Sequence, residues 1–552
     1  MDLGRRLVMR SAVLLLAISA AAWPARAQSH DPRSTVVIVT GAQATIPIPT
    51  LMEGPAAQTA NLEIADHLFL RLANVGPEGI TAGDNSFVPV LAKSWTRRDS
   101  VTLAFDLDPR AVWQDSVPVT SRDVLFTFER ARNPAIAPRL TELLRRLVSV
   151  TAEGDRRVVF RFSRPYAEQF YDVVWHVAPL PAHLLDTIPP ADLPNSSFVT
   201  NPIGDGPYRW VRSVPGQFIE LAANDGFFLG KPAISRVIVR TATDQSARVN
   251  LVMSGEADAM DNVLPPLERL KVIGANKDIR LIPVPSPTLG FLLFNQRDPA
   301  DSTKPHPILS DTDVRRAIIL SLDRRLIVQA AYGSYAEVPY GPASAILWIS
   351  HGTPKPAGPN RSRAQRLLAD RGWKDSDGDG VLDRNGVPLR LTLSYPITSS
   401  ARKQMALIAQ QQLRQSGIDV RLEQYDYEIY LKRRDAGRFD IDFSATTQDP
   451  SPSGLTQGWS CNGGTNIAHY CDPMVDSLIE RANGSMDNSQ EAWHAALRQI
   501  EDDAPAAFMY TPSFVFAVNR RFGNVTIRPE SSWIALWKWT VESPARRNDH
   551  GY

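Results

Sequence analysis

The sequence contains only two cysteines, Cys461 and Cys471, and they lie close together in the chain. Two neighbouring thiols can form a disulfide, bind one metal ion or act as a redox pair. Their spacing is far from Cys-x-x-Cys, and no second pair of metal ligands accompanies them. In an exported protein, a disulfide that closes a short loop is the expected state and would stabilise the fold by about 2–3 kcal/mol. A metal pair and a redox pair remain the alternatives.

A second chemical group is the acidic segment DSDGDGVLD, which carries Asp375, Asp377, Asp379 and Asp383. Carboxylates at alternate positions open the calcium-binding loop of an EF-hand. The twelfth position of such a loop needs a bidentate glutamate, and Gly386 stands there. We therefore expect a turn of aspartates and glycines between a helix and a strand, with calcium binding as the alternative.

The remaining reactive side chains follow no catalytic pattern. The nine histidines include no HExxH motif and no paired spacing, so the sequence gives no support for a catalytic metal. His469 could face a ligand or a metal complex, although a surface histidine is the simpler interpretation. The sequence also has no GxSxG motif and no P-loop. We therefore expect no enzymatic activity, no cofactor and no bound metal.

The first 27 residues have the three parts of a secretory signal. Basic residues, including the pair Arg5 and Arg6, precede a short apolar run at 11–23. That run is well below the roughly 20 residues that span a bilayer. Ala25 and Ala27 then supply the small-x-small pattern that a signal peptidase recognises. We expect cleavage after about Ala27 and a periplasmic protein, and the arginine pair leaves Sec and twin-arginine export both open.

The charge of the chain gives no indication of a nucleic-acid partner. Its formal net charge is +1, and removing residues 1–27 takes away four arginines and one aspartate, which changes it to −2. A nearly neutral chain does not favour nucleic acids or an anionic surface. The 43 prolines favour long extended connections over a helical bundle.

The hydrophobic pattern predicts an α/β fold. A strand is expected at 389–396, a helix at 400–417 and a second strand at 418–426, which together form a parallel crossover. One long amphipathic helix is expected over 311–332. Another is expected from residue 121, with Ser121 as a candidate N-cap.

Several strings follow one another along the chain in a characteristic order. They are VPVLAKSWTRRDSVTLAFDLDPRAVWQDSVPVTSRDVLFTFERA (88–131), GDGPY (204–208), GEAD (255–258), FNQRDP (294–299), DVRRAIILSLDRR (313–325) and SCNGGTNIAHYCDPMVDSLIERA (460–482). Together they resemble the extracytoplasmic solute-binding proteins of ABC importers, family 5, which bind dipeptides, oligopeptides or nickel. The last string resembles the dipeptide-binding branch, which implies a disulfide between Cys461 and Cys471.

The resemblance implies an α/β fold similar to type II periplasmic binding proteins. Two lobes would enclose the ligand and close on it by a hinge near 290–296 and 508–514. Lobe I would be discontinuous, with an inserted subdomain. The implied divisions are 28–78, 198–292 and 512–552 for lobe I, 79–197 for its inserted subdomain, and 293–511 for lobe II. The closed form would dock, as a monomer, on an ABC permease in the inner membrane.

The resemblance also suggests which residues meet the ligand. Thr446 occupies the position of an aspartate that pairs with a peptide's ammonium group, and Phe443 occupies that of a tryptophan. Without the carboxylate, an amine buried there would lack its counter-ion. Arg402 matches an arginine that holds the ligand's carboxylate, although a solvated arginine at a helix start is the alternative. The complete implied ligand-binding set is Thr45, Tyr395, Arg402, Phe443, Ala445, Thr446, Thr447, Asp449 and Trp459.

The sequence therefore predicts the periplasmic solute-binding component of an ABC importer. The expected ligand is a small peptide-like or related molecule with an anionic group and an atypical amino end. The first alternative is an ordinary di- or oligopeptide whose amine is held by another residue. The second is a secreted hydrolase.

Overall fold

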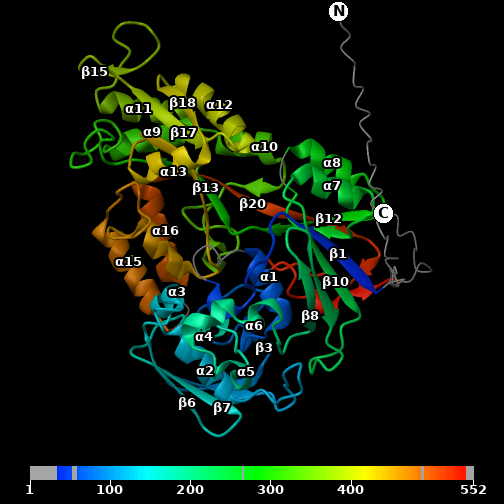
Figure 1. Cartoon of the computed structure of the whole chain (residues 1–552). Helices are drawn as coiled ribbons and strands as arrows, with labels where there is room; N and C mark the ends of the chain where they lie inside the picture. Colours follow the sequence, from blue (N-terminus) through cyan, green and yellow to red (C-terminus); the bar gives the residue numbers. More distant parts are fainter. Residues whose placement is uncertain (1–33, 53–58, 264–265, 487–489, 543–552) are drawn as a thin grey trace, which may run out of the picture.

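The computed structural model describes residues 34–52, 59–263, 266–486 and 490–542 (Figure 1). The predicted signal segment and its cleavage site lie outside this range. Among the described residues, no helix has both the length and the apolar character needed to cross a membrane.

Over the described residues, a 12-stranded mixed sheet runs through the molecule in the order β18-β17-β19-β13-β20-β11-β1-β10-β9-β8. Two further strands, β12 and β14, pair with β20. The long β20 (Ala506–Asn519) is shared: its first part pairs with β13 and its second part with β12. We call the described residues up to 285, together with those from 513, the first half of the molecule. Residues 288–510 form the second half.

The chain passes between the two halves at two neighbouring places. Strand β12 (Ile279–Pro285) ends just before Ser286, and β13 (Thr288–Phe294) begins two residues later. The other passage is within β20, where the backbone N–H of Ser286 donates to Pro512 O at 3.0 Å. These passages are candidates for the predicted hinge; the lobe boundaries and hinge bending stay predictions.

The other strands of the first half are short, and β1, β9 and β11 are largely buried whereas β8 and β10 are mostly not. Strand β1 lies between β11 and β10 and is parallel to both, whereas β8, β9 and β10 are antiparallel neighbours. Their bounds are Thr35–Thr40 for β1, Tyr208–Val214 for β8, Phe218–Ala223 for β9, Arg236–Thr241 for β10 and Ala259–Met260 for β11. The helices are η1 (Pro49–Leu51), α1 (Thr59–Leu68), α7 (Gln245–Met253) and α8 (Leu267–Gly274).

The GDGPY string fixes the end of α1. A Cβ atom on Gly204 would lie 1.8 Å from the carbonyl oxygen of Leu68, so only glycine permits this approach. Between the two glycines, Asp205 accepts a hydrogen bond from the backbone N–H of Leu70 at 2.9 Å. The string therefore holds α1 against the sheet.

The segment predicted as an insertion forms its own antiparallel sheet in the order β4-β5-β7-β6. Thr120 caps α2, and Asp123 completes a capping box. The prediction of Ser121 as the cap was wrong, because Ser121 is already the first helical residue. The bounds are Ala92–Asp99 (β4), Thr102–Leu107 (β5), Leu147–Ala152 (β6), Arg157–Phe162 (β7), Ser121–Ala131 (α2), Pro138–Leu143 (α3), Gln169–Trp175 (α4), Ala182–Leu185 (α5), Pro190–Asn195 (η3) and Ser197–Thr200 (α6). A short pair, β2 (Ala73–Val75) and β3 (Phe87–Pro89), precedes it.

The second half contains the predicted crossover. Strands β17 (Arg390–Pro396) and β18 (Asp419–Tyr425) are parallel and are joined by α12 (Ser400–Arg414). The single helix predicted over 311–332 is two helices, α9 (Thr312–Ser321) and α10 (Arg324–Tyr332). The break has a local cause, because the Asp323 side chain accepts from Leu326 N and caps a new helix.

The remaining elements cover the second half and complete the C-terminal region. Those of the second half are β14 (Ala336–Glu337), η4 (Trp348–Ser350), α11 (Arg361–Asp370), β15 (Asp383–Arg384), β16 (Val387–Pro388), α13 (Tyr427–Asp435), β19 (Ile441–Thr447), η5 (Pro452–Gly454), α14 (Leu455–Trp459), α15 (Pro473–Gly484) and α16 (Gln490–Asp503). The C-terminal elements are β21 (Phe522–Gly523), η6 (Leu536–Lys538) and β22 (Thr540–Val541). Figure 1 shows α15 and α16 side by side, above the inserted sheet.

Candidate functional site

A cavity of about 540 Å³ lies between the two halves. The first half contributes α1, α3, the end of α4 and residues 529–532, and the second half contributes the end of β19 and the loop that follows it. We call it the central cavity. Its lining residues are Pro49, Met52, Thr59, Leu62, Glu63, Ala65, Asp66, Phe69, Arg71, Arg139, Leu140, Trp175, His176, Ala178, Pro287, Ile346, Thr447, Gln448, Asp449, Pro450, Phe514, Pro529, Glu530, Ser531 and Ser532.

Helix α1 supplies the acidic wall of this cavity. Thr59, Glu63 and Asp66 are four and three residues apart, so they share one face of the helix. The start of the helix is held by Asn61, whose side-chain oxygen accepts from the backbone N–H of Thr45 at 2.6 Å. This face therefore brings two buried carboxyl groups, those of Glu63 and Asp66, to the wall of the cavity.

Arginines pair with two of the carboxylates in the cavity wall. Asp66 pairs with Arg71 at 2.6 Å, and both side chains are buried. The guanidinium of Arg71 also lies over the Trp175 ring, 4.5 Å from its centroid. On the opposite wall, Asp449 lies 3.8 Å from Arg139, which comes from the inserted segment. This second pair joins the two halves across the cavity.

Glu63 differs from its neighbours because its partner is a hydroxyl. The residue is 8% exposed, and its side chain bonds to Ser532, which lines the same cavity. Burial raises the pKa of Glu63 to about 8, and the charges of Asp261 and Asp66 add to the effect. Burial also raises the pKa of Asp66, although the Arg71 charge opposes that shift. At neutral pH, Glu63 therefore holds a proton more readily than an ordinary glutamate.

A smaller cavity of about 210 Å³ adjoins the central one, and Phe514 lines both. Arg402 and Ala445 lie in its wall together with Tyr332 and Tyr510. One guanidinium nitrogen of Arg402 donates to the Phe443 carbonyl at 3.2 Å. Its buried Nε has no hydrogen-bond partner in the described part of the chain. This cavity therefore presents a cation with spare donor capacity.

The two halves are also joined by a buried hydrogen-bond network beside the central cavity. Glu168, from the inserted segment, accepts from Ser451 Oγ of the second half at 2.5 Å. Its other oxygen accepts from Thr81 Oγ1 at 2.6 Å, and Thr81 in turn accepts from the Trp348 indole N–H at 3.2 Å. Burial raises the pKa of Glu168, while the bonds from Ser451 and Thr81 oppose the shift. The network holds the inserted segment against the second half.

The structure divides the predicted ligand-binding residues into groups. Thr447 and Asp449 line the central cavity, and Arg402 and Ala445 line the smaller one. Thr446 is exposed and lines neither, because residues alternate along β19 and it points to the face opposite Ala445 and Thr447. Contact between these residues and a ligand stays a prediction.

The remaining predicted residues are not among those that line either cavity. Tyr395 and Phe443 have no exposed surface and belong to the core of the second half. Trp459 packs between the rings of Phe291 and Phe508. Burial in these cores gives the three rings a packing role, and their contact with a ligand is untested. Thr45 is exposed and is not among the residues that line either cavity.

The acidic wall was missed by the sequence reasoning. Glu63, Asp66 and Arg71 lie in a stretch that reads as an ordinary amphipathic helix and its continuation. A signal was present, since Glu63 and Asp66 share one face, but a polar helical face is usually solvated. Only the contact with residues 529–532, more than 450 positions away, shows that this face is covered.

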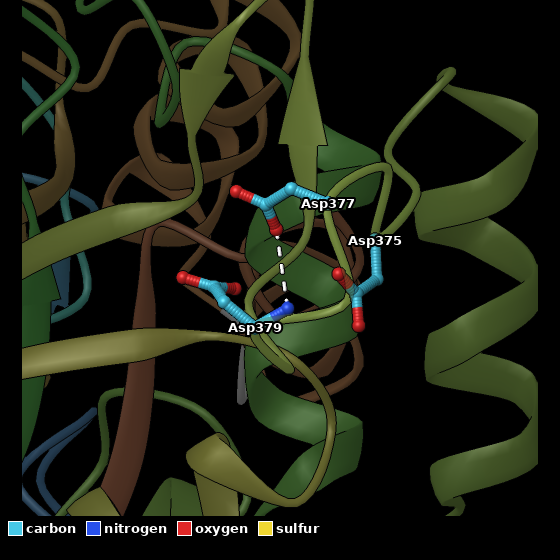
Figure 2. Close-up of side chains that lie close together, drawn as sticks. All are labelled: Asp375, Asp377 and Asp379. Atoms are coloured by element: carbon cyan, nitrogen blue, oxygen red, sulfur yellow. Dashed lines mark hydrogen bonds between the residues drawn. The ribbon is translucent and has the colours of Figure 1, made fainter.

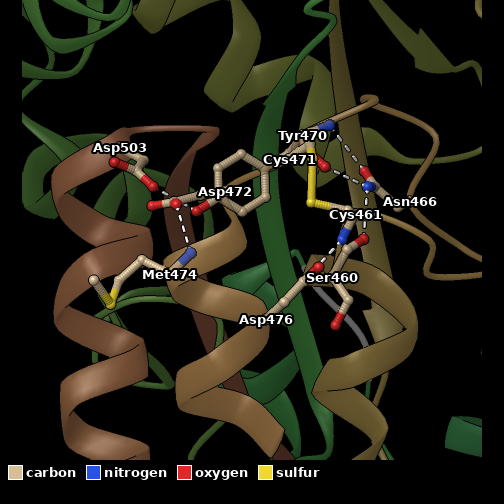
Figure 3. Close-up of a disulfide and its surroundings, with 9 residues drawn as sticks. All are labelled: Ser460, Cys461, Asn466, Tyr470, Cys471, Asp472, Met474, Asp476 and Asp503. Atoms are coloured by element: carbon tan, nitrogen blue, oxygen red, sulfur yellow. Dashed lines mark hydrogen bonds between the residues drawn. A yellow bond between two sulfur atoms is a disulfide. The ribbon is translucent and has the colours of Figure 1, made fainter.

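The predicted disulfide is present (Figure 3). Cys461 and Cys471 are joined, with their Cα atoms 4.2 Å apart. Within the loop, the Asn466 amide donates to the carbonyls of Ser460 and Tyr470 at 2.9 and 2.6 Å. The loop is therefore stabilised by hydrogen bonds as well as by the covalent link.

The aspartate segment forms an exposed turn (Figure 2). Carboxyl oxygens of Asp375, Asp377 and Asp379 lie within 4.8 Å of one another. Each carboxylate also accepts a backbone N–H of the same turn, for example Asp377 from Asp379 N at 3.1 Å. These bonds suit the predicted Asp-Gly turn, and calcium binding remains untested.

Comparison with known proteins identifies related chains. Residues 86–467 match the family model described as "Bacterial extracellular solute-binding proteins, family 5 Middle". The oligopeptide-binding protein AppA of Bacillus subtilis (strain 168) is 25% identical over 452 residues, covering 79% of this chain and 80% of its own length.

Solved structures agree on the fold. The AppA structure, in complex with a nonapeptide, has a TM-score of 0.70 at 22% identity and covers 92% of this chain and 99% of its own. The substrate-binding protein CtaP of Listeria monocytogenes has a TM-score of 0.78 at 22% identity, with coverages of 92% and 99%. NikZ of Campylobacter jejuni, in complex with Ni(L-His), has a TM-score of 0.71 at 22% identity, with coverages of 92% and 100%. These matches confirm the predicted α/β fold, similar to type II periplasmic binding proteins.

Proposed function

We propose that this chain, which belongs to the bacterial extracellular solute-binding proteins of family 5, captures a peptide-like solute between its two halves for an ABC importer. The observation that carries the proposal is the 540 Å³ central cavity, which is lined by both halves. A ligand that touches both walls favours the closed arrangement by the contacts that it makes only there.

The smaller cavity fits the anionic end of such a ligand. Arg402 has a buried Nε without a hydrogen-bond partner in the described residues, and a guanidinium binds a carboxylate with two parallel hydrogen bonds. The Ser399 side chain accepts from the backbone N–H of Arg402 at 3.3 Å, which helps to fix the start of α12. We assign the ligand's carboxylate to Arg402.

The proposal includes the cellular setting. The chain would be exported, cleaved after about Ala27 and active in the periplasm, where its closed form meets the membrane permease. It would act as a monomer without a cofactor. The nickel-histidine complex in the NikZ structure makes metal complexes the second candidate class of ligand.

A thermal-shift screen of the purified chain tests the proposal. The panel contains mixed di-, tri- and longer peptides, the same peptides as C-terminal amides, and nickel-histidine. We expect carboxylate-bearing peptides to raise the Tm, and we expect Arg402→Ala to reduce that shift by the equivalent of a tenfold or greater loss of affinity.

Three results would count against this assignment. Stabilisation by nickel-histidine alone would move the chain to the second ligand class. Equal stabilisation by the amidated peptides would remove the role of Arg402. Turnover of a bound peptide by the purified chain would support the secreted-hydrolase alternative.

A further inference from the structure

Glu63 is a buried acid in the central cavity that has no cationic partner among the described residues. The three other carboxylates that line this cavity each lie within ion-pair distance of an arginine. Glu63 instead bonds to the Ser532 hydroxyl, and the residue is 8% exposed. An ionised carboxylate at such a place costs free energy unless a cation arrives to pair with it.

We propose that Glu63 recognises a primary ammonium group, the free amino end of the captured solute, at the wall of the central cavity. This inference rests on the proposed function and specifies its ligand. The amine-binding position predicted on β19 is Thr446, which carries no charge and points away from the cavity side of that strand. Glu63 supplies a carboxyl from the opposite half of the molecule.

The surroundings of Glu63 favour a single positive charge. On its own helix, Asp66 is paired with Arg71, and the pKa of His67 is lowered to about 4 by burial, so His67 is neutral near pH 7. From the region after β11, Asp261 faces Glu63. The guanidinium of Arg248 lies 3.8 Å from Asp261 and offsets its charge.

The available ligand atoms also favour an ammonium group. A divalent cation needs six or more oxygen ligands, usually with several free carboxylates. An ammonium has three donors and needs only a few acceptors. The Glu63 carboxylate and the Ser532 hydroxyl provide such acceptors side by side.

Proton release provides a readout that a structural role would not produce. Burial raises the pKa of Glu63 to about 8, so near pH 6.5 its carboxyl group is protonated before a ligand binds. An arriving ammonium stabilises the carboxylate, and the carboxyl proton passes to the solvent. Binding should therefore release roughly one proton per ligand.

The test uses the mature protein, without the predicted signal segment, and two probes. One probe is a mixture of tripeptides with free amino ends, and the other is the same mixture after N-acetylation. Calorimetry at pH 6.5, in buffers of different ionisation enthalpy, measures affinity and proton release together. The variant is Glu63→Gln, which keeps the size and a hydrogen bond. The control is Glu268→Gln, an exposed glutamate on α8.

We expect the wild type and Glu268→Gln to bind the free-amine mixture roughly ten- to a hundredfold more tightly than the acetylated one, with release of a proton. Glu63→Gln should lose both the preference and the proton release, while still binding the acetylated mixture. Binding without preference for the free amine, or a preference that survives in Glu63→Gln, would overturn the role of Glu63 and leave the proposed function intact. If neither mixture binds, both the role of Glu63 and the proposed function are refuted.

Discussion

Replacing Cys461 and Cys471 with alanine should destabilise the second half of the molecule by an amount that the loop length determines. The disulfide joins residues with a sequence separation of 10. In the chain-entropy model, opening a loop of this size costs about 2.7 kcal/mol, because the reduced unfolded chain gains conformational freedom. The folded loop should keep its shape, since the Asn466 amide still donates to the carbonyls at each end of it.

The measured quantity is the unfolding temperature of the transition that contains this loop. A chain with two halves need not unfold in one step, so calorimetry must resolve the transitions before a shift is assigned. For a unit of about 200 residues, this loss of free energy lowers Tm by roughly 5–10 °C. Neither cysteine lines the central or the smaller cavity, so the increase in Tm caused by ligand should be the same in the variant.

Reduction supplies the matched control. Dithiothreitol should lower the wild-type transition to that of the double alanine variant and leave the variant unchanged. If mass spectrometry confirms the disulfide and both proteins still unfold at the same temperature, the entropic reasoning is wrong for this loop. Such a result would mean that the unfolded segment is already constrained by other contacts.

Two further predictions follow from tight packing and from buried acids. In a denaturation assay, Gly290→Ala should destabilise the protein by roughly 1–3 kcal/mol, because the new Cβ would lie 2.0 Å from the Tyr510 ring. The control is Gly358→Ala, which should have little effect because no atom lies within 4 Å of the new Cβ. Burial raises the pKa of Asp172, which accepts from the Tyr166 hydroxyl, to about 8. The stabilisation that the protonated Asp172 side chain provides is therefore complete below about pH 4 and is lost as the pH rises through 8. Asp172→Asn should flatten the fall of Tm between pH 5 and 8, and an unchanged slope would contradict this.

Individual helices and strands could be predicted from the sequence where a single spacing of apolar residues continued without interruption. The crossover from β17 through α12 to β18 follows from alternating apolar residues and a long helical repeat. The break between α9 and α10 was missed because its cause is the cap at Asp323, one polar residue inside an otherwise continuous pattern. The cap of α2 was predicted one position too late, because Thr120 and Ser121 can both cap a helix and only the capping box between Thr120 and Asp123 selects the first of them.

The sheet order could not be deduced from the pattern, because its pairs are distant in sequence. Met260 on β11 pairs with Ala517 on β20, and Val39 on β1 pairs with Met260. Such contacts depend on the whole chain, so only the resemblance to a family gave the architecture. The same limit applied to the cavities, whose walls combine α1 with residues 529–532.

The aromatic residues of the predicted site show why rings are ambiguous signals in a sequence. Large rings near a ligand-facing loop are frequent in binding sites, but they are even more frequent in cores. Along β19, one face begins in the core at Phe443 and reaches the cavities at Ala445 and Thr447. The strand therefore changes from packing to lining within two residues, a change that no hydrophobic period can reveal.

The separation of charges between the halves gives the two assigned residues a joint consequence. Arg402 comes from the second half and Glu63 from the first, and Phe514 lies in the walls of both cavities. A solute with a carboxylate at one end and an ammonium at the other would contact both residues at once, and such a solute would favour the closed state by both contacts. A solute with one charge would engage one half, and its differential affinity for the closed state would be smaller. If both assignments hold, the charges that would select the ligand are also the charges that would favour the closed state, so selection and closure would depend on one set of contacts.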